Sequence, residues 1–297
     1  MDLIANRAII LLLAIALDFA IGEPPSPIHP TIWMGKEVAF LEDKFSKSAL
    51  SGYIIPIIVI CSFLVLSLIL IYISGFFLNY SDIPFWVMMA VFLKPTFSIR
   101  PLITIPLKIE RGLENGDIES SREMLTHLVR RDRDLDEKHI RSAAIESIGE
   151  SGVDSIITPF LFYMVFGLPG AYFFRVVNTL DSMLGYRELG PFGKPSARLD
   201  DLCNFVGARL AAFLYALPKV MELEKVIACS KTFESRNAGY SISSMAIHLN
   251  TNVEKIDHYS LRVGRDPEKG DIRRAILCLI KAVAICLFIL APIMIYV

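Results

Sequence analysis

Long apolar stretches alternate with mixed-charge segments along this chain, and the alternation predicts membrane helices separated by polar helical regions. The clearest apolar stretch lies between Lys47 and Asp82, where no charged residue occurs. Residues 53–78 alone are enough for an α-helix to cross a hydrocarbon core about 30 Å thick. We therefore expect one all-α, polytopic integral membrane domain over residues 1–297. Its membrane segments are expected near residues 8–21, 53–78, 83–93, 155–174, 205–223 and 275–297.

The first apolar segment allows two interpretations. Ala14-Ile15-Ala16 imitates a signal-peptidase site, which would make it a cleaved signal peptide. The apolar stretch before that site is short, so a retained membrane helix that ends near Asp18 is preferred. Residues 83–93 cover only about half a span and are predicted to be a re-entrant, interfacial or tilted piece. Four Pro and Gly residues within 155–174 predict a kinked or broken helix there.

Two polar regions, 94–154 and 224–274, combine helix-forming residues with apolar positions three or four apart. This spacing predicts amphipathic, water-facing helices. Lys and Arg concentrate in both regions, so we expect both to be cytoplasmic. Within the second region, Asn237-Ala238-Gly239 is interpreted either as a small substrate-contacting loop or as a plain turn between helices.

Composition supports a membrane protein and excludes other classes. The 297 residues are 54% hydrophobic and 21% charged, which is too apolar for a soluble domain but too charged for a bare helical bundle. A formal net charge of −1 argues against nucleic acid as a partner. The five cysteines form no C-x-x-C pair, so packed thiols are expected rather than zinc or an iron–sulfur cluster.

Between residues 175 and 209, charged and amide side chains crowd between two apolar segments. An unpaired ion in an apolar interior costs several kcal/mol, so these groups need partners. They can pair with one another as internal salt bridges, or they can bind a charged substrate and its metal. Helical spacing would bring several of them onto shared faces, and Gly185 allows a turn. The residues are Arg175, Asn178, Asp181, Arg198, Asp200, Asp201, Asn204 and Arg209.

A second candidate is the carboxylate stripe Glu146, Glu150 and Asp154, which recur at i, i+4 and i+8 just before an uncharged run. Three like charges on one stripe repel each other unless a cation neutralises them. Mg²⁺ that carries nucleotide phosphates would do so, because it prefers one or two carboxylates plus phosphate oxygens. The alternative is neutralisation by the nearby Arg130-Arg131 and Arg141.

Residues 22–30 contain four prolines that predict a rigid loop, which places Glu23 and His29 beside the membrane surface. His29 is interpreted either as a metal or phosphate contact or as a capping and packing residue.

Several motifs together resemble one family. NTLDSMLGY (178–186) followed by FGKPSARLDDLCNFVGAR (192–209) is similar to the CobD/CbiB family of adenosylcobinamide-phosphate synthases. The resemblance extends to DFAIGEPPSPIHP (18–30), LVRRD (128–132) and AIESIGESGVDSIITPFLF (144–162), and it fades into RNAGYSISSMA (236–246). The family usually has Asn where Ser151 stands and Pro where Arg236 stands. These departures leave a direct role for position 151 open.

The resemblance implies an ATP-dependent ligase that attaches (R)-1-amino-2-propanol O-phosphate, or a related amino alcohol, to adenosylcobyric acid. ATP and Mg²⁺ are the implied cofactors, and activation as an acyl phosphate is our hypothesis by analogy with other ligases. Under this hypothesis the catalytic or general-base candidates are Glu146, Glu150, Asp154, Asp181, Asp200 and Asp201, of which Glu146, Glu150, Asp154 and Asp181 are also the metal candidates. The substrate-binding candidates are Glu23, His29, Arg130, Arg131, Arg175, Asn178, Arg198, Asn204, Arg209 and Asn237.

ATP use also constrains the topology. Two full crossings between the cytoplasmic polar regions would place the 175–209 motif outside the cell, so residues 155–174, 205–223 or both are predicted to be re-entrant or buried in protein. The expected location is the cell membrane, with a site open to the cytoplasm and homo-oligomers possible. Two alternatives remain open, a non-catalytic membrane scaffold or sensor and a transporter with a midplane site.

Overall fold

The computed structural model describes residues 3–129 and 134–296, and it confirms the predicted all-α class. Within these residues the chain divides into two compact units, and each unit is assembled from separate stretches of the sequence. The first comprises residues 3–99, 158–203 and 290–296, and the second comprises 100–129, 134–157 and 204–289. Helices α9 (Lys194–Ala216) and α12 (Asp271–Tyr296) contribute residues to both units.

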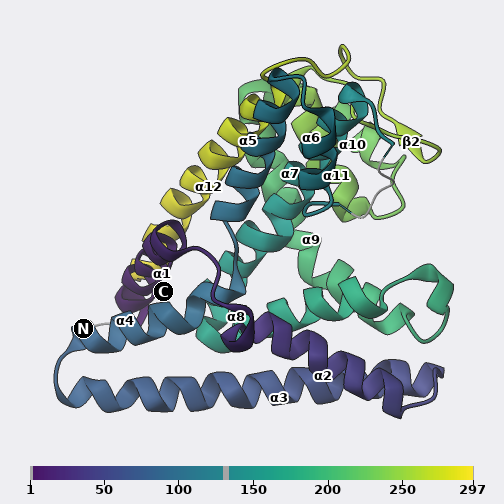
Figure 1. The fold of residues 1–297 in the computed structure, drawn as a ribbon. Helices are drawn as coiled ribbons and strands as arrows, with labels where there is room; N and C mark the ends of the chain where they lie inside the picture. Colours follow the sequence, from purple (N-terminus) through teal and green to yellow (C-terminus); the bar gives the residue numbers. More distant parts are fainter. Residues whose placement is uncertain (1–2, 130–133, 297) are drawn as a thin grey trace. The chain divides into compact units, whose positions relative to one another are not determined.

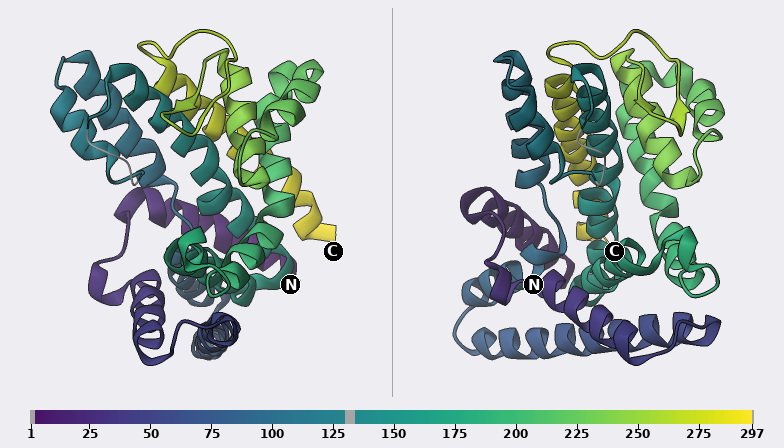
Figure 2. Two further views of the ribbon diagram at one scale, coloured as in Figure 1. Left: turned by 90° about the vertical axis from the view of Figure 1, so that its right-hand side faces the viewer. Right: turned by 45° about the vertical axis from the view of Figure 1, so that its right-hand side comes forward.

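The first unit contains the longest helix of the described chain, α3. Ser48 begins this helix with a reciprocal cap: its hydroxyl accepts from the Ser51 N–H at 3.2 Å, and the Ser51 hydroxyl accepts from the Ser48 N–H at 2.9 Å. Helices α2 and α8 pack beside α3, and α1 packs against α4 (Figures 1 and 2). The helices of this unit are α1 (Leu3–Ile21), α2 (Pro30–Lys44), α3 (Ala49–Phe76), α4 (Asp82–Leu93) and α8 (Thr158–Leu184), with 3-10 turns at Ser26–Ile28, Phe77–Asn79, Lys94–Thr96 and Arg187–Leu189.

The second unit is built around α7, whose residues 140–149 are all buried. Helices α5, α6 and α11 pack against it (Figures 1 and 2). A short antiparallel hairpin is tied to α7 because the Ser142 hydroxyl donates to the Glu254 carbonyl at 2.9 Å and accepts from the Glu254 N–H at 2.8 Å. The other elements are α5 (Arg100–Glu114), α6 (Ile118–Leu125), α7 (Glu137–Gly152), a π-helical turn (Val153–Ile157), a 3-10 stretch (Leu217–Glu222), α10 (Leu223–Ser230), α11 (Arg236–Leu249), β1 (Glu254–Lys255) and β2 (Tyr259–Ser260).

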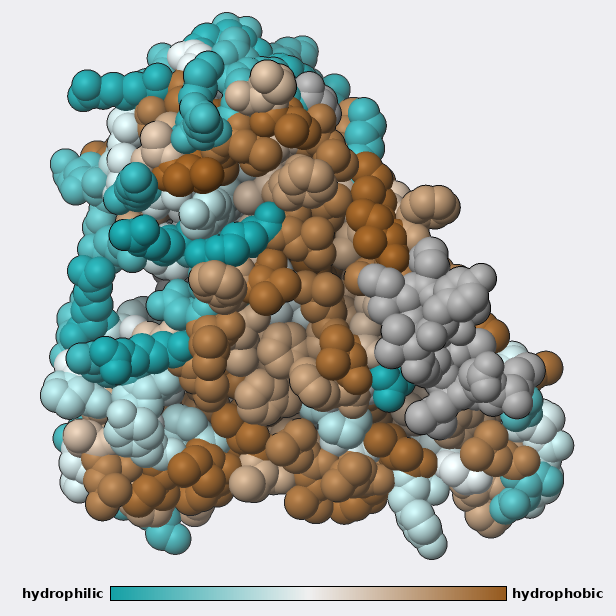
Figure 3. Space-filling model, turned by 180° about the vertical axis from the view of Figure 1, so that it is seen from behind, coloured by the Kyte–Doolittle hydropathy of each residue, from teal (hydrophilic) through white to brown (hydrophobic). Residues whose placement is uncertain are grey.

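Two helical stretches of the described chain are long and apolar enough to cross a membrane, Ala49–Asn79 and Glu137–Leu184. A third is added if the bent pair Asp82–Thr96 and Arg100–Glu114 forms one broken span. The outward face of α3 carries large apolar side chains, with Tyr72 85% exposed. Figure 3 shows apolar surface along the lower edge, where α3 lies. Segments 8–21, 205–223 and 275–297 are not among these candidates, so their membrane assignment stays a prediction.

The predicted break within 155–174 is confirmed. Helix α8 is interrupted at Gly167, whose φ of 67° and ψ of −155° are not helical. Such a backbone conformation strongly favours glycine. Pro169 follows and cannot donate a backbone hydrogen bond. The thiol prediction is confirmed for Cys278 and Cys286, which are buried, and is wrong for Cys61, which lies exposed on α3.

Two predictions in the polar regions are wrong. Helix α7 does not face water, because α11, α5 and α6 cover it on several sides, and even Arg141 and Glu146 on it are buried. Asn237 lies neither in a loop nor in a connecting turn but in the first turn of α11, which Ser235 caps. Gly239 allows α11 to pack closely against the end of α10, since a Cβ at this position would lie 2.6 Å from the Ser230 carbonyl oxygen.

Candidate functional site

In the first unit, an ion cluster joins the proline-rich loop to the end of α4, and two of its members, Asp18 and Lys94, are buried. The Lys94 ammonium lies 3.0 Å from the Asp18 carboxylate and 2.9 Å from that of Glu23. Asp18 also accepts from the Ile99 N–H at 3.2 Å, and Glu23 accepts from the Ser98 hydroxyl at 2.7 Å. Asp18 and Lys94 are 0% and 4% exposed, so removing either would leave a buried charge without its counter-ion.

Glu23 is held ionised by this cluster. Burial alone would raise the pKa of its carboxyl, but hydrogen bonds from His29, Lys94 and Ser98 outweigh burial and lower that pKa to about 2. Sequence inspection identified Glu23 and missed Lys94 and Ser98. The available signal was a single lysine that directly follows the apolar run 83–93 and precedes Pro95.

The contacts of His29 favour the capping interpretation. Its Nδ1 accepts from the Thr31 N–H at 3.2 Å, at the start of α2, so the remaining ring proton lies on Nε2. Nε2 lies 3.0 Å from Glu23 and donates to it. Neither ring nitrogen then offers a lone pair to a metal while this network holds. A role for His29 in substrate binding stays a prediction.

The 175–209 motif lies on α8 of this unit and on α9, of which this unit holds the residues up to Cys203. Arg175, Asn178 and Asp181 share α8, which ends just before Gly185, and Arg198, Asp200 and Asp201 lie in the first two turns of α9. Arg175 donates from Nε to the Thr31 hydroxyl at 3.4 Å.

Two carboxylates of the motif influence each other across these helices. The charge of Asp201 repels that of Asp181, although twenty positions separate them in the sequence. Asp181 is half-buried, and the adjacent backbone crowds it, since a Cβ at Gly185 would overlap its side chain. Carboxylate oxygens are hard ligands, and a divalent cation bound near both groups would neutralise their charges.

In the second unit, the carboxylate stripe lies where α7 passes into the π-helical turn. Glu146 is buried, Glu150 and Asp154 are half-buried, and the turn begins one residue before Asp154. π-helical turns frequently occur at functional sites. Within the described residues no three His, Cys, Asp or Glu side chains form a group that could hold a metal by itself. A metal that enters with nucleotide phosphates needs only one or two carboxylates, so the stripe's metal role stays a prediction.

The alternative neutralisation of the stripe by arginines stays a prediction. Arg141 is turned to other carboxylates, with Glu137 as a close partner and Glu110 at 3.5 Å. Arg130 and Arg131, the other proposed neutralisers and predicted substrate ligands, lie outside the described residues.

Arg209 and Asn237, predicted separately, meet in this unit. The Arg209 Nη1 donates to Asn237 Oδ1 at 3.0 Å and to the Phe205 carbonyl at 2.8 Å. Its guanidinium carbon lies 3.5 Å from the centre of the Phe205 ring and 4.7 Å from that of Tyr240. Ring stacking fixes the plane of the guanidinium. Among the described contacts Nη1 makes the hydrogen bonds, and Nη2 makes none.

The predicted site residues therefore form two sets. Each set lies within one unit and mixes carboxylates with cationic or amide side chains. The first unit holds Glu23, His29, Arg175, Asn178, Asp181, Arg198, Asp200 and Asp201, and the second holds Glu146, Glu150, Asp154, Asn204, Arg209 and Asn237.

A comparison with protein families decides where this arrangement belongs. The family model described as "CobD/Cbib protein" matches residues 11–283, which includes both sets of residues. The chain belongs to the CobD/CbiB family. The family resemblance drawn from the sequence motifs is thereby confirmed.

Curated relatives align with this family member over most of their length. A protein named "Probable cobalamin biosynthesis protein CobD" from Methanocaldococcus jannaschii is 35% identical, over 88% of this chain and 91% of the relative. Proteins with the same name from Pyrococcus abyssi and Thermoplasma acidophilum are 37% and 38% identical, with 90 to 91% of each chain covered. No solved structure matches the chain.

Proposed function

We propose that this protein is an ATP-dependent amide ligase of cobalamin biosynthesis. It joins (R)-1-amino-2-propanol O-phosphate, or a related amino alcohol, to the carboxylate of adenosylcobyric acid and yields adenosylcobinamide phosphate. The names of the curated relatives support the pathway, and their near-complete coverage supports a shared architecture. The reaction itself is inferred from the family resemblance and from the chemistry of the two sets of residues.

The observation that carries the proposal is that Asp201 of α9 repels the half-buried Asp181 of α8 electrostatically. A cation bound beside Asp181 would relieve this repulsion. Carboxylate oxygens are what Mg²⁺ prefers, and Asp181 and Asp201 are the residues that we assign to it. When bound, Mg²⁺ shields the phosphate oxygens of ATP.

The ligase chemistry needs two steps, because a carboxylate is a poor acyl donor at neutral pH. In the first, the corrinoid carboxylate oxygen attacks the γ-phosphorus of ATP and ADP leaves. In the second, the amine nitrogen attacks the acyl carbon, inorganic phosphate leaves, and the amine loses a proton.

The protein's own residues supply positioning and a proton acceptor. Arg175, Arg198 and Arg209 are proposed to hold phosphate or corrinoid carboxylates, because a guanidinium matches both anions with two parallel hydrogen bonds. The described hydrogen bonds of Arg209 use Nη1, so Nη2 remains a donor for this role. Asp200 and the stripe Glu146, Glu150 and Asp154 are proposed as acceptors for the amine proton.

A complementation experiment tests the proposal. A bacterial strain that lacks its own member of the family, supplied with cobyric acid, is expected to regain cobalamin-dependent growth when it expresses this protein. Asp181→Asn and Asp201→Asn are each expected to abolish growth at wild-type expression. Asp43→Asn, which changes an exposed carboxylate on α2, is the matched control and is expected to support growth. No growth with membrane-inserted wild-type protein would contradict the ligase and favour a non-catalytic scaffold.

A further inference from the structure

The break in α8 leaves backbone carbonyls that a cation from another helix satisfies. Gly167 interrupts the helix, so the carbonyls just before it lose their helical partners. Arg7 of α1 donates from Nη1 to the carbonyls of Met164 at 2.7 Å and Val165 at 3.2 Å. A Cβ on Gly167 would lie 3.5 Å from Arg7 Nη2. Arg7 therefore caps the first half of α8.

These carbonyls do not neutralise the charge of Arg7. Within the described residues no carboxylate forms an ion pair with Arg7, and only its Nη1 is used in hydrogen bonds. An arginine in apolar surroundings is costly without a counter-ion.

A second polar group nearby also has no protein partner. The Tyr163 side chain is 1% exposed, and its hydroxyl has no hydrogen-bond partner among the described residues. A buried hydroxyl without a partner costs about 1–3 kcal/mol. Arg7 and Tyr163 thus present an unpaired cation and an unused O–H donor, which together match one anion.

Both groups line the same cavity, of about 220 Å³. Liquid water occupies about 30 Å³ per molecule, so the cavity has room for an anionic group with the start of an apolar chain but not for a nucleotide or a corrinoid. Apart from Arg7 and Tyr163, the lining is almost entirely apolar and includes Ile10, Met89 and Phe166. An amphiphile fits this lining better than a free ion.

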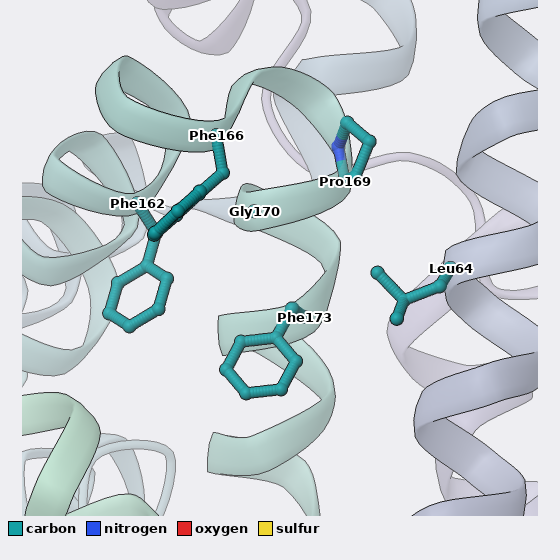
Figure 4. A pocket seen from close by; sticks show the side chains of 6 residues that line it. All are labelled: Leu64, Phe162, Phe166, Pro169, Gly170 and Phe173. Carbon is teal, nitrogen blue, oxygen red and sulfur yellow. The ribbon is translucent and has the colours of Figure 1, made fainter.

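A second recess continues from the same break. It measures about 420 Å³ and shares Phe166 and Pro169 with the first cavity. Its remaining lining is Leu64, Phe162, Gly170 and Phe173, with no charged side chain. Figure 4 shows Leu64 of α3 pointing toward the part of α8 that carries Pro169 and Phe173. The recess has the apolar lining that an acyl chain needs.

We propose that the break in α8 is a lipid-binding site. The phosphate of a membrane phospholipid accepts hydrogen bonds from Arg7 and from the Tyr163 hydroxyl, and one of its chains extends along the apolar recess. The lipid supplies the counter-charge that Arg7 lacks in the described protein. The site contains no residue of either set of candidate catalytic residues, so its test is independent of the proposed ligase activity.

Native mass spectrometry of the detergent-purified, delipidated protein tests the site. The protein is titrated in separate series with dioleoylphosphatidylglycerol, with dioleoylglycerol, which lacks the phosphate, and with inorganic phosphate. The wild type is expected to bind the phospholipid at least tenfold more tightly than either of the other two. Equal binding of dioleoylglycerol would overturn the role of the phosphate, and equal binding of inorganic phosphate would overturn the lipid as its source.

The decisive variant is Tyr163→Phe. Losing one hydrogen bond to a charged group is expected to weaken phospholipid binding about tenfold. The fold is expected to survive, because the hydroxyl removed has no protein partner. Tyr172→Phe is the matched control: Tyr172 is equally buried on the same helix, lines neither cavity, and donates to the Phe92 carbonyl at 3.2 Å. Unchanged affinity in Tyr163→Phe, or an equal loss in Tyr172→Phe, would overturn the proposal.

Discussion

Replacing Gly152 with alanine tests how tightly the end of α7 is packed, just where the carboxylate stripe enters the π-helical turn. A Cβ at this position would overlap the Tyr215 hydroxyl and would lie 2.7 Å from Leu279 Cδ1. The leucine methyl lies at the end of a flexible side chain and can rotate away. Tyr215 is rigid and fully buried, so the overlap with its hydroxyl decides the cost.

The expected magnitude follows from this geometry. Overpacking a core by one methyl group costs about 1–3 kcal/mol. Tyr215→Phe alone should cost less than about 1 kcal/mol, because the hydroxyl's contact with the Gly149 carbonyl is long, at 3.5 Å. The double variant should be more stable than Gly152→Ala alone, because Tyr215→Phe removes the atom that the new methyl group meets.

Thermal unfolding in detergent, followed by circular dichroism, measures this cycle. Gly152→Ala should lower Tm by about 2–12 °C, given about 2–4 °C per kcal/mol for chains of comparable size. Tyr215→Phe should restore at least half of that loss. Additive losses in the double variant would refute the packing argument, and a Gly152→Ala protein as stable as the wild type would refute the burial of α7.

Two further predictions concern charged groups. The folded-state pKa of Glu23 is about 2, below its ordinary value of 4.5, so its ion cluster adds stability above pH 4.5 that is lost as pH falls toward 2. The Tm of the wild type should therefore fall more steeply between pH 4.5 and pH 2 than the Tm of Glu23→Gln. Parallel Tm profiles of the two proteins would count against the cluster. Arg209→Lys keeps the charge but loses ring stacking and the fixed fork, so the apparent KM for the amino-alcohol phosphate should rise several-fold with a smaller change in kcat. An unchanged KM would remove Arg209 from the proposed clamps.

Local patterns predicted those parts of the fold that local physics determines. Pro and Gly within 155–174 predicted the break that occurs at Gly167. Proline has no backbone N–H to donate to the preceding helical turn, and glycine readily adopts a positive φ that ends a helix. Helical spacing also placed Arg175 and Asp181 correctly on one helix. The electrostatic repulsion between Asp181 and Asp201 could not be predicted, because it depends on how α8 and α9 pack.

The errors have a common physical origin. Charged residues on α7 predicted a water-facing helix, but charge alone does not show which neighbouring helices cover a face, and α11 buries this one. Asn and Gly at 237 and 239 predicted a loop, yet Gly239 is there because α10 approaches too closely for a side chain. Lys94 was overlooked because its partners, Asp18 and Glu23, lie more than seventy positions earlier.

The ligase proposal is tested most directly by one assay of the purified, detergent-solubilised protein. Adenosylcobyric acid, (R)-1-amino-2-propanol O-phosphate, ATP and Mg²⁺ are supplied together, and corrinoid mass and released phosphate are followed in parallel. We expect a corrinoid mass gain that matches amide formation, with one phosphate released for each product and none when the amine is omitted. Folded protein that yields no mass gain, or that releases phosphate at the same rate without the amine, would contradict it.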